Sequence, residues 1–195
     1  IAERRFSLGV QLIAAHADPL DLAMGYSDVA EGAIVAPAGL APGEFAKAHG
    51  RIEGADLLIL ALGRLGGRAL THASDLDIIY VYDAPDGAMS DGPKPLSATD
   101  YFNRLANRVT AALSVSTAAG PLYDVDTRLR PQGSEGMLAV SLPGFLDYQR
   151  KEAWTWEHMA LCRARPIYGS PERRERLREA ICAILQEKRD PAMTR

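Results

Sequence analysis

The sequence predicts an α+β protein with a small mixed sheet and helices at both ends of the chain. Apolar residues at helical spacing occur within residues 3–35 and again from Ser141 onward. Between them, two short apolar runs flank a glycine-rich loop, as expected for buried strands. The strands are few and their connections vary, which favours α+β over a doubly wound sheet. We therefore expect an N-terminal helical segment at 1–50, an αβ core at 51–140 and a C-terminal helical segment at 141–195.

The composition is that of an ordinary globular protein. Of 195 residues, 47% are hydrophobic, and the formal net charge of −3 argues against a large nucleic-acid surface. Two cysteines, Cys162 and Cys182, are too few for a disulfide framework, so we expect a reducing, cytoplasmic setting. The longest apolar run, 57–62, is too short to span a membrane. No signal-peptide pattern opens the chain. The first residue is Ile1 and not Met, so we expect a piece of a longer protein.

Two helices are expected before the core. Residues 3–16 have the apolar spacing of the first helix. Asp18 is a good cap and Pro19 suits the first turn of the second helix. That helix should stop at Pro37, and the Pro-, Gly- and Ala-rich residues 37–50 should form a connector.

The later elements follow from short apolar runs, turn residues and caps. Residues from Ser141 onward have a helical pattern, and Ser170 followed by Pro171 marks the start of the last helix. The expected elements of the core are a strand at 57–62, a glycine loop at 63–67, a strand at 76–82, an exposed loop at 85–95, a helix capped by Thr99 and ending near Ser114, a strand at 121–130, a turn at 131–136 and a short strand at 137–140.

Two aspartates, Asp75 and Asp77, stand where the second strand begins. Their spacing of two puts both carboxylates on one face of a strand. Like charges repel each other and resist desolvation, so a fold needs a reason to keep them together. A magnesium ion is one reason, because it prefers carboxylate and phosphate oxygens. The alternative is a solvent-facing pair with no ligand, since Asp-x-Asp is common.

A third carboxylate, Asp126, is followed at spacings of two by Arg128 and Arg130, so all three would lie on one face of a continuous strand. If the strand continues, one face presents a carboxylate that can complete a metal site and two guanidinium groups that match phosphate. A surface stripe of alternating charge is the alternative. A second basic pair, Arg163 and Arg165, fits a solvated edge and a reach towards phosphate equally well.

The glycine loop at 63–67 does not fit the better-known nucleotide motifs. Leu65 occupies the place of the second glycine in a dinucleotide fingerprint, and the chain has no Walker A or EF-hand pattern. Gly66 and Gly67 leave the backbone bare, so a triphosphate could approach their amides. A plain tight turn is the alternative.

Two further groups of residues have simpler explanations. His158 and Cys162 have a spacing that can hold zinc, but without a second pair of ligands we expect them to pack. Trp154 and Trp156 are expected to be core or interface anchors rather than platforms for base stacking.

Three separated motifs resemble one known family. GRLGG at 63–67, SDLDII at 74–79 and YDVDTRLRP at 123–131 are similar to glutamine synthetase adenylyltransferases, which belong to the polymerase-β-like nucleotidyltransferase superfamily. The resemblance runs at least over residues 60–169, with the motifs in the family's order. Arg64 replaces the usual lysine and keeps the charge.

The resemblance implies a polymerase-β-like fold in which residues 51–140 are the nucleotidyltransferase catalytic core. That core would transfer AMP from ATP to a tyrosine of glutamine synthetase, with two Mg²⁺ ions. The PII signal protein is a further implied partner, bound through the full-length chain. Neither nucleic acid nor a membrane is expected as a partner. The implied catalytic and metal-binding residues are Asp75, Asp77 and Asp126, and the implied nucleotide-binding residues are Gly66, Gly67, Ser74, Arg128 and Arg130.

The family has two such domains, one that adds AMP and one that removes it by phosphorolysis. GML at 136–138, DYQ at 147–149 and EAWTWEH at 152–158 resemble the adenylylating half. The removing half is the first alternative, and a transferase of UMP to PII is the second, which the RLRP and WTW stretches fit less well. A nucleotide-binding regulatory module without turnover is the third, and its weakness is that a retired site has no need of three clustered carboxylates.

Overall fold

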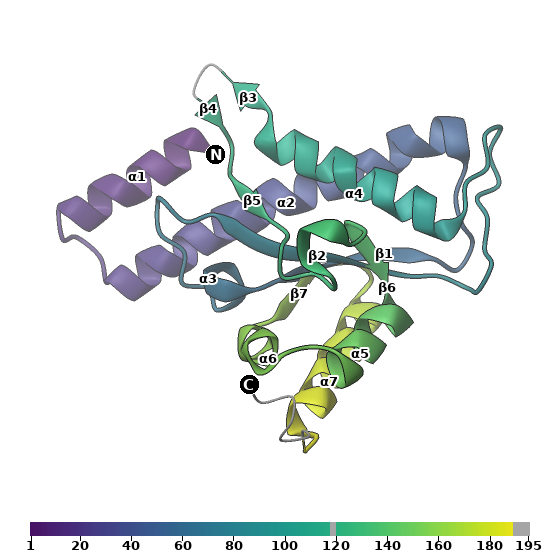
Figure 1. Cartoon of the computed structure of the whole chain (residues 1–195). Coiled ribbons are helices and arrows are strands. Elements are labelled where there is room, and N and C mark those ends of the chain that lie inside the picture. Colours follow the sequence, from purple (N-terminus) through teal and green to yellow (C-terminus); the bar gives the residue numbers. More distant parts are fainter. Residues whose placement is uncertain (118–119, 189–195) are drawn as a thin grey trace.

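The computed structural model describes residues 1–117 and 120–188 and has a mixed sheet with helices on both faces (Figure 1). The predicted α+β class, with a small mixed sheet and helices at both ends, is confirmed. Residues 189–195 of the expected C-terminal helical segment lie outside the described residues. The elements are α1 (Ala2–Ile13), α2 (Pro19–His49), β1 (Asp56–Ala61), α3 (Gly63–Gly66), β2 (Leu76–Asp83), α4 (Ala98–Ser114), β3 (Ser116–Thr117), β4 (Gly120–Pro121), β5 (Val125–Asp126), a 3₁₀ turn (Gly133–Glu135), β6 (Ala139–Ser141), α5 (Leu142–Lys151), α6 (Thr155–Leu161), β7 (Arg165–Tyr168) and α7 (Pro171–Gln186).

The sheet is built around β1 and β2, which pair in antiparallel fashion. β7 pairs with the other edge of β1, with an irregularity between Ile59 and Leu60. The remaining edge of β2 pairs in parallel with two short strands, β5 beside its first residues and β6 beside its second half. The start of β2 therefore lies between the β1–α3 connection and β5.

Both faces of the sheet are covered by apolar side chains. α2 and α4 lie over one face, where the core includes Ile34, Ile59 and Leu105. α5 and α7 lie over the other, where the core includes Leu60 and Leu177. Alternate residues of β1 enter opposite cores, as the period of a strand requires. Within the described ranges, no helix has the length and apolar character needed to cross a membrane.

The prediction that the second helix stops at Pro37 is wrong. α2 continues to His49 with Pro37 and Pro42 inside it. A proline in a helix removes one N–H donor and costs free energy. The buried residues Ala38 and Phe45 nevertheless continue the buried stripe of the helix past both prolines. We attribute the continuous helix to this packing, which outweighs local propensity in most protein helices.

Helix caps were predicted with mixed success. Asp18 caps α2 as expected. The cap of α4 is Ser97 rather than Thr99, because the Asp100 amide donates to Ser97 Oγ at 3.2 Å. The Thr99 hydroxyl instead lies 2.9 Å from the Tyr82 hydroxyl. α7 begins at Pro171 after Ser170, as predicted.

Three predictions of local structure need correction. The glycine loop at 63–67 contains one helical turn, α3. The predicted strand at 121–130 is broken, and its central part is only β5, Val125–Asp126. Residues 165–168 form a strand where a helix was expected, an edge strand short enough to tolerate Pro166. The predicted strands at 57–62, 76–82 and 137–140 are confirmed with small shifts at their ends.

Candidate metal and nucleotide site

Asp75, Asp77 and Asp126 come together at the start of β2. Asp77 and Asp126 are register partners in the parallel pair β2–β5, and Asp75 precedes β2. One carboxylate oxygen from each lies within 4.8 Å of the others. Asp75 is exposed, whereas Asp77 and Asp126 are partly buried. The structure thus gathers the three aspartates that the sequence analysis selected.

The carboxylates differ in their electrostatic surroundings. Burial, together with the charges of Asp75 and Asp126, raises the pKa of Asp77 above its ordinary value. Hydrogen bonds from Arg128 lower the pKa of Asp126, through contacts of 2.8 Å from its amide and 3.0 Å from Nε. The raised pKa of Asp77 reflects burial first and then repulsion between the carboxylates, and a divalent cation would offset both. The ligand set contains only carboxylate oxygens, which fits Mg²⁺.

Gly63, which the sequence analysis did not select, lies directly against this cluster. Its φ of +52° is in the left-handed region, and a Cβ there would lie 2.2 Å from Asp77 Oδ2. Only glycine combines that backbone conformation with such close approach. The next-door amide of Leu62 donates to the Asp77 carbonyl at 2.9 Å. The available signal was the position of Gly63 immediately after the first apolar run.

Gly66 and Gly67 have different reasons to be glycine. A Cβ on Gly66 would lie 2.1 Å from the Arg163 carbonyl oxygen and 2.7 Å from that of Ala61, so packing alone requires glycine. A Cβ on Gly67 would meet its nearest atoms at 3.5 Å or more, an ordinary contact. Both amides donate to carbonyls of the α3 turn itself. The two amides that were expected to meet a triphosphate are thus already bonded within the turn. Gly66 is explained by packing, whereas a Cβ would fit at Gly67.

Arg128 and Arg130 do not share one strand face, because β5 ends at Asp126. The Arg128 side chain is 78% exposed and turns back onto Asp126. Arg130 is only 8% exposed. Its guanidinium donates to backbone carbonyls of the surrounding loop, those of Thr127, Ser134, Gly136 and Met137. Arg130 thus organises the loop after Asp126, while Arg128 stays at the surface beside the carboxylates.

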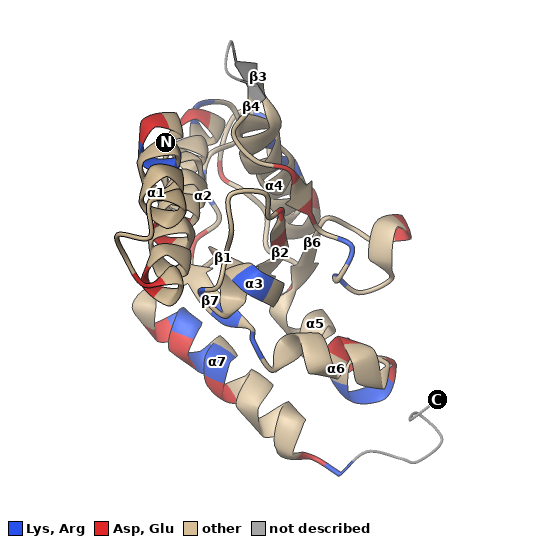
Figure 2. Ribbon diagram, turned by 90° about the vertical axis from the view of Figure 1, so that its left-hand side faces the viewer, with Lys and Arg blue, Asp and Glu red and all other residues tan. Residues whose placement is uncertain are grey.

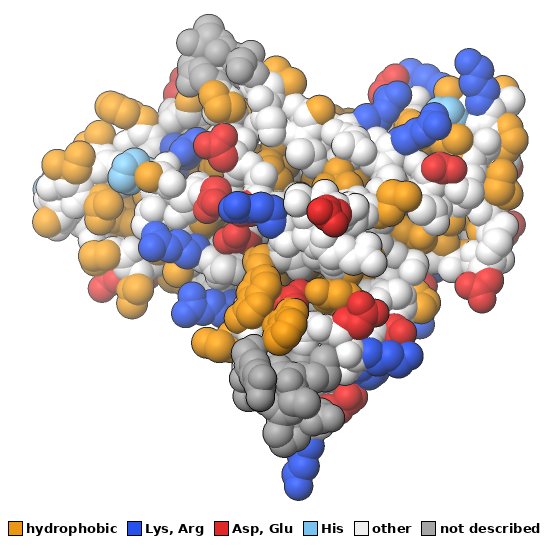
Figure 3. All heavy atoms as spheres, viewed as in Figure 1, with side chains coloured by type: hydrophobic (Ala, Val, Ile, Leu, Met, Phe, Trp, Pro, Cys, Tyr) orange, Lys and Arg blue, Asp and Glu red, His pale blue; other side chains and the backbone are white. Residues whose placement is uncertain are grey.

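Two cavities share Asp75 and Asp124 in their linings. One, of about 290 Å³, is lined by Asp75 and residues 124–128. The other, of about 430 Å³, is lined by residues that include Arg5, His72 and Ser74. The Ser74 hydroxyl accepts a hydrogen bond from the Thr71 amide at 3.1 Å, which closes the turn before Asp75. Figure 3 shows acidic side chains gathered around a basic one over β5 and the start of β2.

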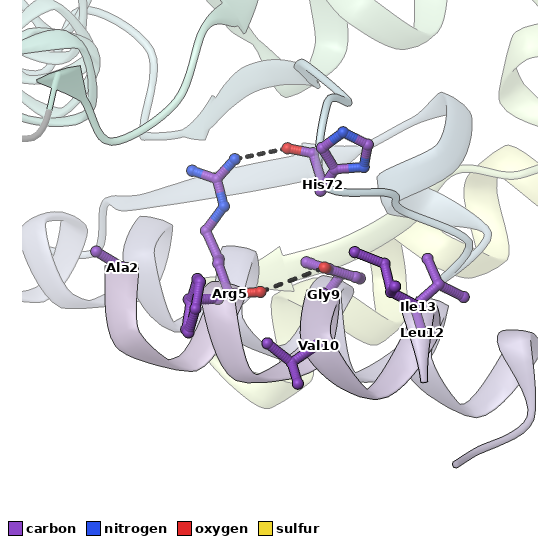
Figure 4. A pocket seen from close by; sticks show the side chains of 9 residues that line it. Ala2, Arg5, Gly9, Val10, Leu12, Ile13 and His72 are labelled. Carbon is purple, nitrogen blue, oxygen red and sulfur yellow. Dashed lines mark hydrogen bonds between the residues drawn. The ribbon is translucent and has the colours of Figure 1, made fainter. Parts of the chain in front are cut away.

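Arg5 of α1 connects the two loops that lead to the carboxylates. Its guanidinium donates to the His72 carbonyl at 2.7 Å and to the Leu122 carbonyl at 2.8 Å. It also lies over the Tyr123 ring, 4.5 Å from the centroid. Figure 4 shows Arg5 reaching from α1 to His72, beside a mostly apolar cavity of about 480 Å³ along α1. That cavity contains none of the three aspartates.

The other candidates lie outside the cluster. His158 is buried and its Nε2 lies 2.7 Å from the Gln149 carbonyl oxygen, consistent with the expected packing role. Cys162 is an exposed free thiol rather than a packed one, and Cys182 is also free. Trp154 and Trp156 are 48% and 55% exposed, so they are not core residues. Their interpretation as interface anchors stays a prediction.

Three carboxylates lie beside a glycine turn at the edge of a mixed sheet. This arrangement is a candidate site for a divalent cation and phosphate groups. The chain belongs to the glutamate-ammonia ligase adenylyltransferase family, whose model matches residues 4–180. This confirms the resemblance found in the sequence.

Two relatives illustrate the similarity, both named bifunctional glutamine synthetase adenylyltransferase/adenylyl-removing enzyme. The protein of Xanthobacter autotrophicus is 44% identical over 191 residues, which are 97% of this chain and 19% of the relative. That of Mesorhizobium japonicum is 43% identical over 192 residues, 98% of this chain and 20% of the relative. The chain therefore spans about a fifth of the length of these curated relatives.

Proposed function

We propose that the chain is a polymerase-β-like nucleotidyltransferase domain that transfers AMP from ATP to a tyrosine of glutamine synthetase. The observation that carries the proposal is the approach of carboxylate oxygens from Asp75, Asp77 and Asp126 to within 4.8 Å of one another. The names of the relatives support the choice of reaction and target. In this reaction the tyrosine oxygen bonds to the α-phosphorus of ATP, and the bond from that phosphorus to pyrophosphate breaks.

The carboxylates have two tasks in this proposal. Asp75 and Asp77 would hold two Mg²⁺ ions, and Asp126 would hold one of them. Such ions, when bound, supply positive charge to the attacking and leaving oxygens. Asp126 would also accept the proton of the tyrosine hydroxyl. Because the hydrogen bonds from Arg128 lower its pKa and so weaken it as a base, this role requires Arg128 to turn away from it first.

The remaining site residues would either bind the phosphate groups or hold the turns and loops around the carboxylates. Arg128 is exposed beside Asp126, so its guanidinium can turn to a phosphate group. Gly67 would permit close approach of the triphosphate, Gly66 packs the α3 turn against the Arg163 and Ala61 carbonyls, and Ser74 closes the turn before Asp75. For Arg130, the proposal is support of the loop rather than direct phosphate contact, because its guanidinium already donates to four carbonyl groups.

The adenylylating direction is favoured by the EAWTWEH stretch at 152–158, which resembles that half of the family. The half-exposed Trp154 and Trp156 suit contact with a protein target, because tryptophan is enriched at the centres of interfaces. A cytoplasmic setting and a regulatory contact with the PII signal protein, made by the full-length protein, belong to the same proposal.

A comparison of the two directions tests the proposal. The full-length protein is given unmodified glutamine synthetase with labelled ATP and Mg²⁺, and separately AMP-modified glutamine synthetase with phosphate. Because each full-length relative is named for both activities, Asp77→Asn serves to assign the activity to this domain. Loss of labelling, with release of ADP from the modified enzyme unchanged, supports the adenylylating direction. Loss of ADP release alone would assign the domain to the removing reaction.

A further inference from the structure

Arg165, at the start of β7 and outside the expected catalytic core at 51–140, holds the α3 turn. Arg165 Nε donates to the Gly66 carbonyl at 3.2 Å, and Nη2 donates to the Leu65 carbonyl at 3.2 Å. The sequence left Arg165 between a solvated edge and a reach towards phosphate. The structure shows a third arrangement, in which its partly buried guanidinium binds the end of the glycine turn.

The same guanidinium binds Glu31 of α2. Nη1 lies 3.0 Å from Oε2, and Nη2 contacts Oε1 in the second arm of a bidentate pair. Arg68, just after the turn, pairs with Asp28 at 2.6 Å and lies 3.8 Å from Glu31. Two acidic residues of α2, Asp28 and Glu31, therefore bind two arginines at the C-terminal end of the turn. α3 and β7 lie side by side in Figures 1 and 2, and basic residues colour both in Figure 2.

The turn needs such support. α3 has only four residues, and so short a helix is not stable by itself. The carbonyls of Leu65 and Gly66 stand at its C-terminal end, where the negative end of the helix favours a cation, and the Leu65 carbonyl also accepts from the Arg68 amide at 3.2 Å. Gly63 at its other end lies against Asp77 Oδ2. A shift of the turn therefore changes both the glycine backbone and the packing around Asp77.

We propose that Arg165 is a positioning residue that, with Glu31, holds the glycine turn ready to receive the phosphate groups of a nucleotide. The proposal rests on the proposed function, because it assigns the turn to nucleotide binding. It also gives the flanking segments a task, since Glu31 comes from the N-terminal helices and Arg165 from the C-terminal part. Preorganised geometry matters because small displacements of positioning groups cost large factors in rate.

The test compares two arginine variants in the full-length protein. Arg165→Met removes the guanidinium at similar length. Arg173→Met is the matched control, because Arg173 is buried to a similar degree, pairs with Asp83 at 3.1 Å and donates to the Gly54 carbonyl, away from the turn. Amide hydrogen exchange is followed in peptides covering residues 62–69, and the Kd for ATP with Mg²⁺ is measured alongside the melting temperature.

We expect Arg165→Met to speed exchange in residues 62–69 at least fivefold and to raise the Kd for ATP at least tenfold, while Arg173→Met changes neither. Arg165→Lys should recover only part of the affinity, because an ammonium group cannot reproduce the planar fork. Should Arg165→Met fail to fold, Glu31→Gln is measured in its place, with smaller effects in the same direction. Unchanged exchange in residues 62–69 would overturn the positioning role. A different outcome is that Arg165→Met speeds exchange in residues 62–69 but the unsubstituted protein binds no ATP. That outcome would overturn the proposed function and the link to nucleotide binding, and would leave only the support of the turn by Arg165.

Discussion

Asp77 of β2 and Asp126 of β5 are register partners across two parallel strands, and this pairing brings two distant parts of the chain to one site. Because a slip of one residue would turn side chains of β5 to the opposite face, the register itself determines whether the carboxylates meet. β5 has only two residues, so its position depends on the loops around it. Arg5 supports the loop before β5 by donating to the Leu122 carbonyl, and Arg130 supports the loop after β5 by donating to the Thr127 carbonyl.

The first prediction concerns the balance between stability and activity at the carboxylates. Asp75→Asn should abolish AMP transfer, because a metal ligand is lost. The same substitution should slightly stabilise the metal-free protein, because it relieves repulsion on the partly buried Asp77. A rise in Tm of about 1 to 3 °C is expected. Asp83→Asn, at the far end of β2, is the control and should retain activity. Activity of Asp75→Asn within about tenfold of the unsubstituted protein, or ~1.4 kcal/mol, would contradict the assignment.

The second prediction concerns pH. Arg128 lowers the pKa of Asp126 and opposes the rise in the pKa of Asp77. In Arg128→Gln both pKa values should rise, so protons should compete with Mg²⁺ at higher pH than in the unsubstituted protein. Titration of Mg²⁺ affinity as pH falls measures this shift, with the exposed Arg104→Gln as a charge-matched control. Superimposable pH profiles for Arg128→Gln and the unsubstituted protein would rule out this coupling.

The third prediction separates the two glycines. Gly66→Ala should lower Tm markedly, because its Cβ would collide with two backbone carbonyl oxygens. Gly67→Ala should leave Tm within about 2 °C, because its Cβ would make only ordinary contacts. If phosphate approaches the backbone at Gly67, Gly67→Ala should still raise the Kd for ATP about tenfold. Normal ATP binding by Gly67→Ala would exclude close approach of the ligand there.

The fourth prediction concerns Arg5. Arg5→Met removes two hydrogen bonds to the loops that precede Asp75 and Asp126. Hydrogen bonds from a charged group are each worth roughly 1.5–3 kcal/mol, and solvent reduces this at a partly exposed site. We expect Tm to fall by about 2 to 6 °C and Mg²⁺ affinity to weaken. The exposed neighbour Arg4→Met should change neither quantity, and equal effects of the two substitutions would refute the bracing role.

The central strands and the carboxylates could be predicted from the sequence because their signals are local. β1 and β2 are apolar on both faces, and Asp75 and Asp77 stand at a strand start. The motifs also identified the family, which the comparisons confirm. Such features need no knowledge of which distant segments pack together.

The rest depends on contacts that the sequence does not reveal. α2 passes through Pro37 because of a buried stripe, and β7 forms because β1 offers a free edge. Arg130 was expected on a strand face, but the loop carbonyls bind it instead. Gly63 was not selected, because its reason is the position of the Asp77 carboxylate in three dimensions. In each case tertiary packing decides what local preference leaves open.

The most direct test of the central claim is mass spectrometry of glutamine synthetase after incubation with the full-length protein, ATP and Mg²⁺. The account predicts AMP on a tyrosine of the target, and no AMP when Asp77→Asn replaces the unsubstituted protein at equal folded concentration. Asp77→Asn keeps nearly the same shape, so its loss of activity would report on charge at the cluster. Equal modification by both proteins would contradict the claim that these three carboxylates carry the reaction.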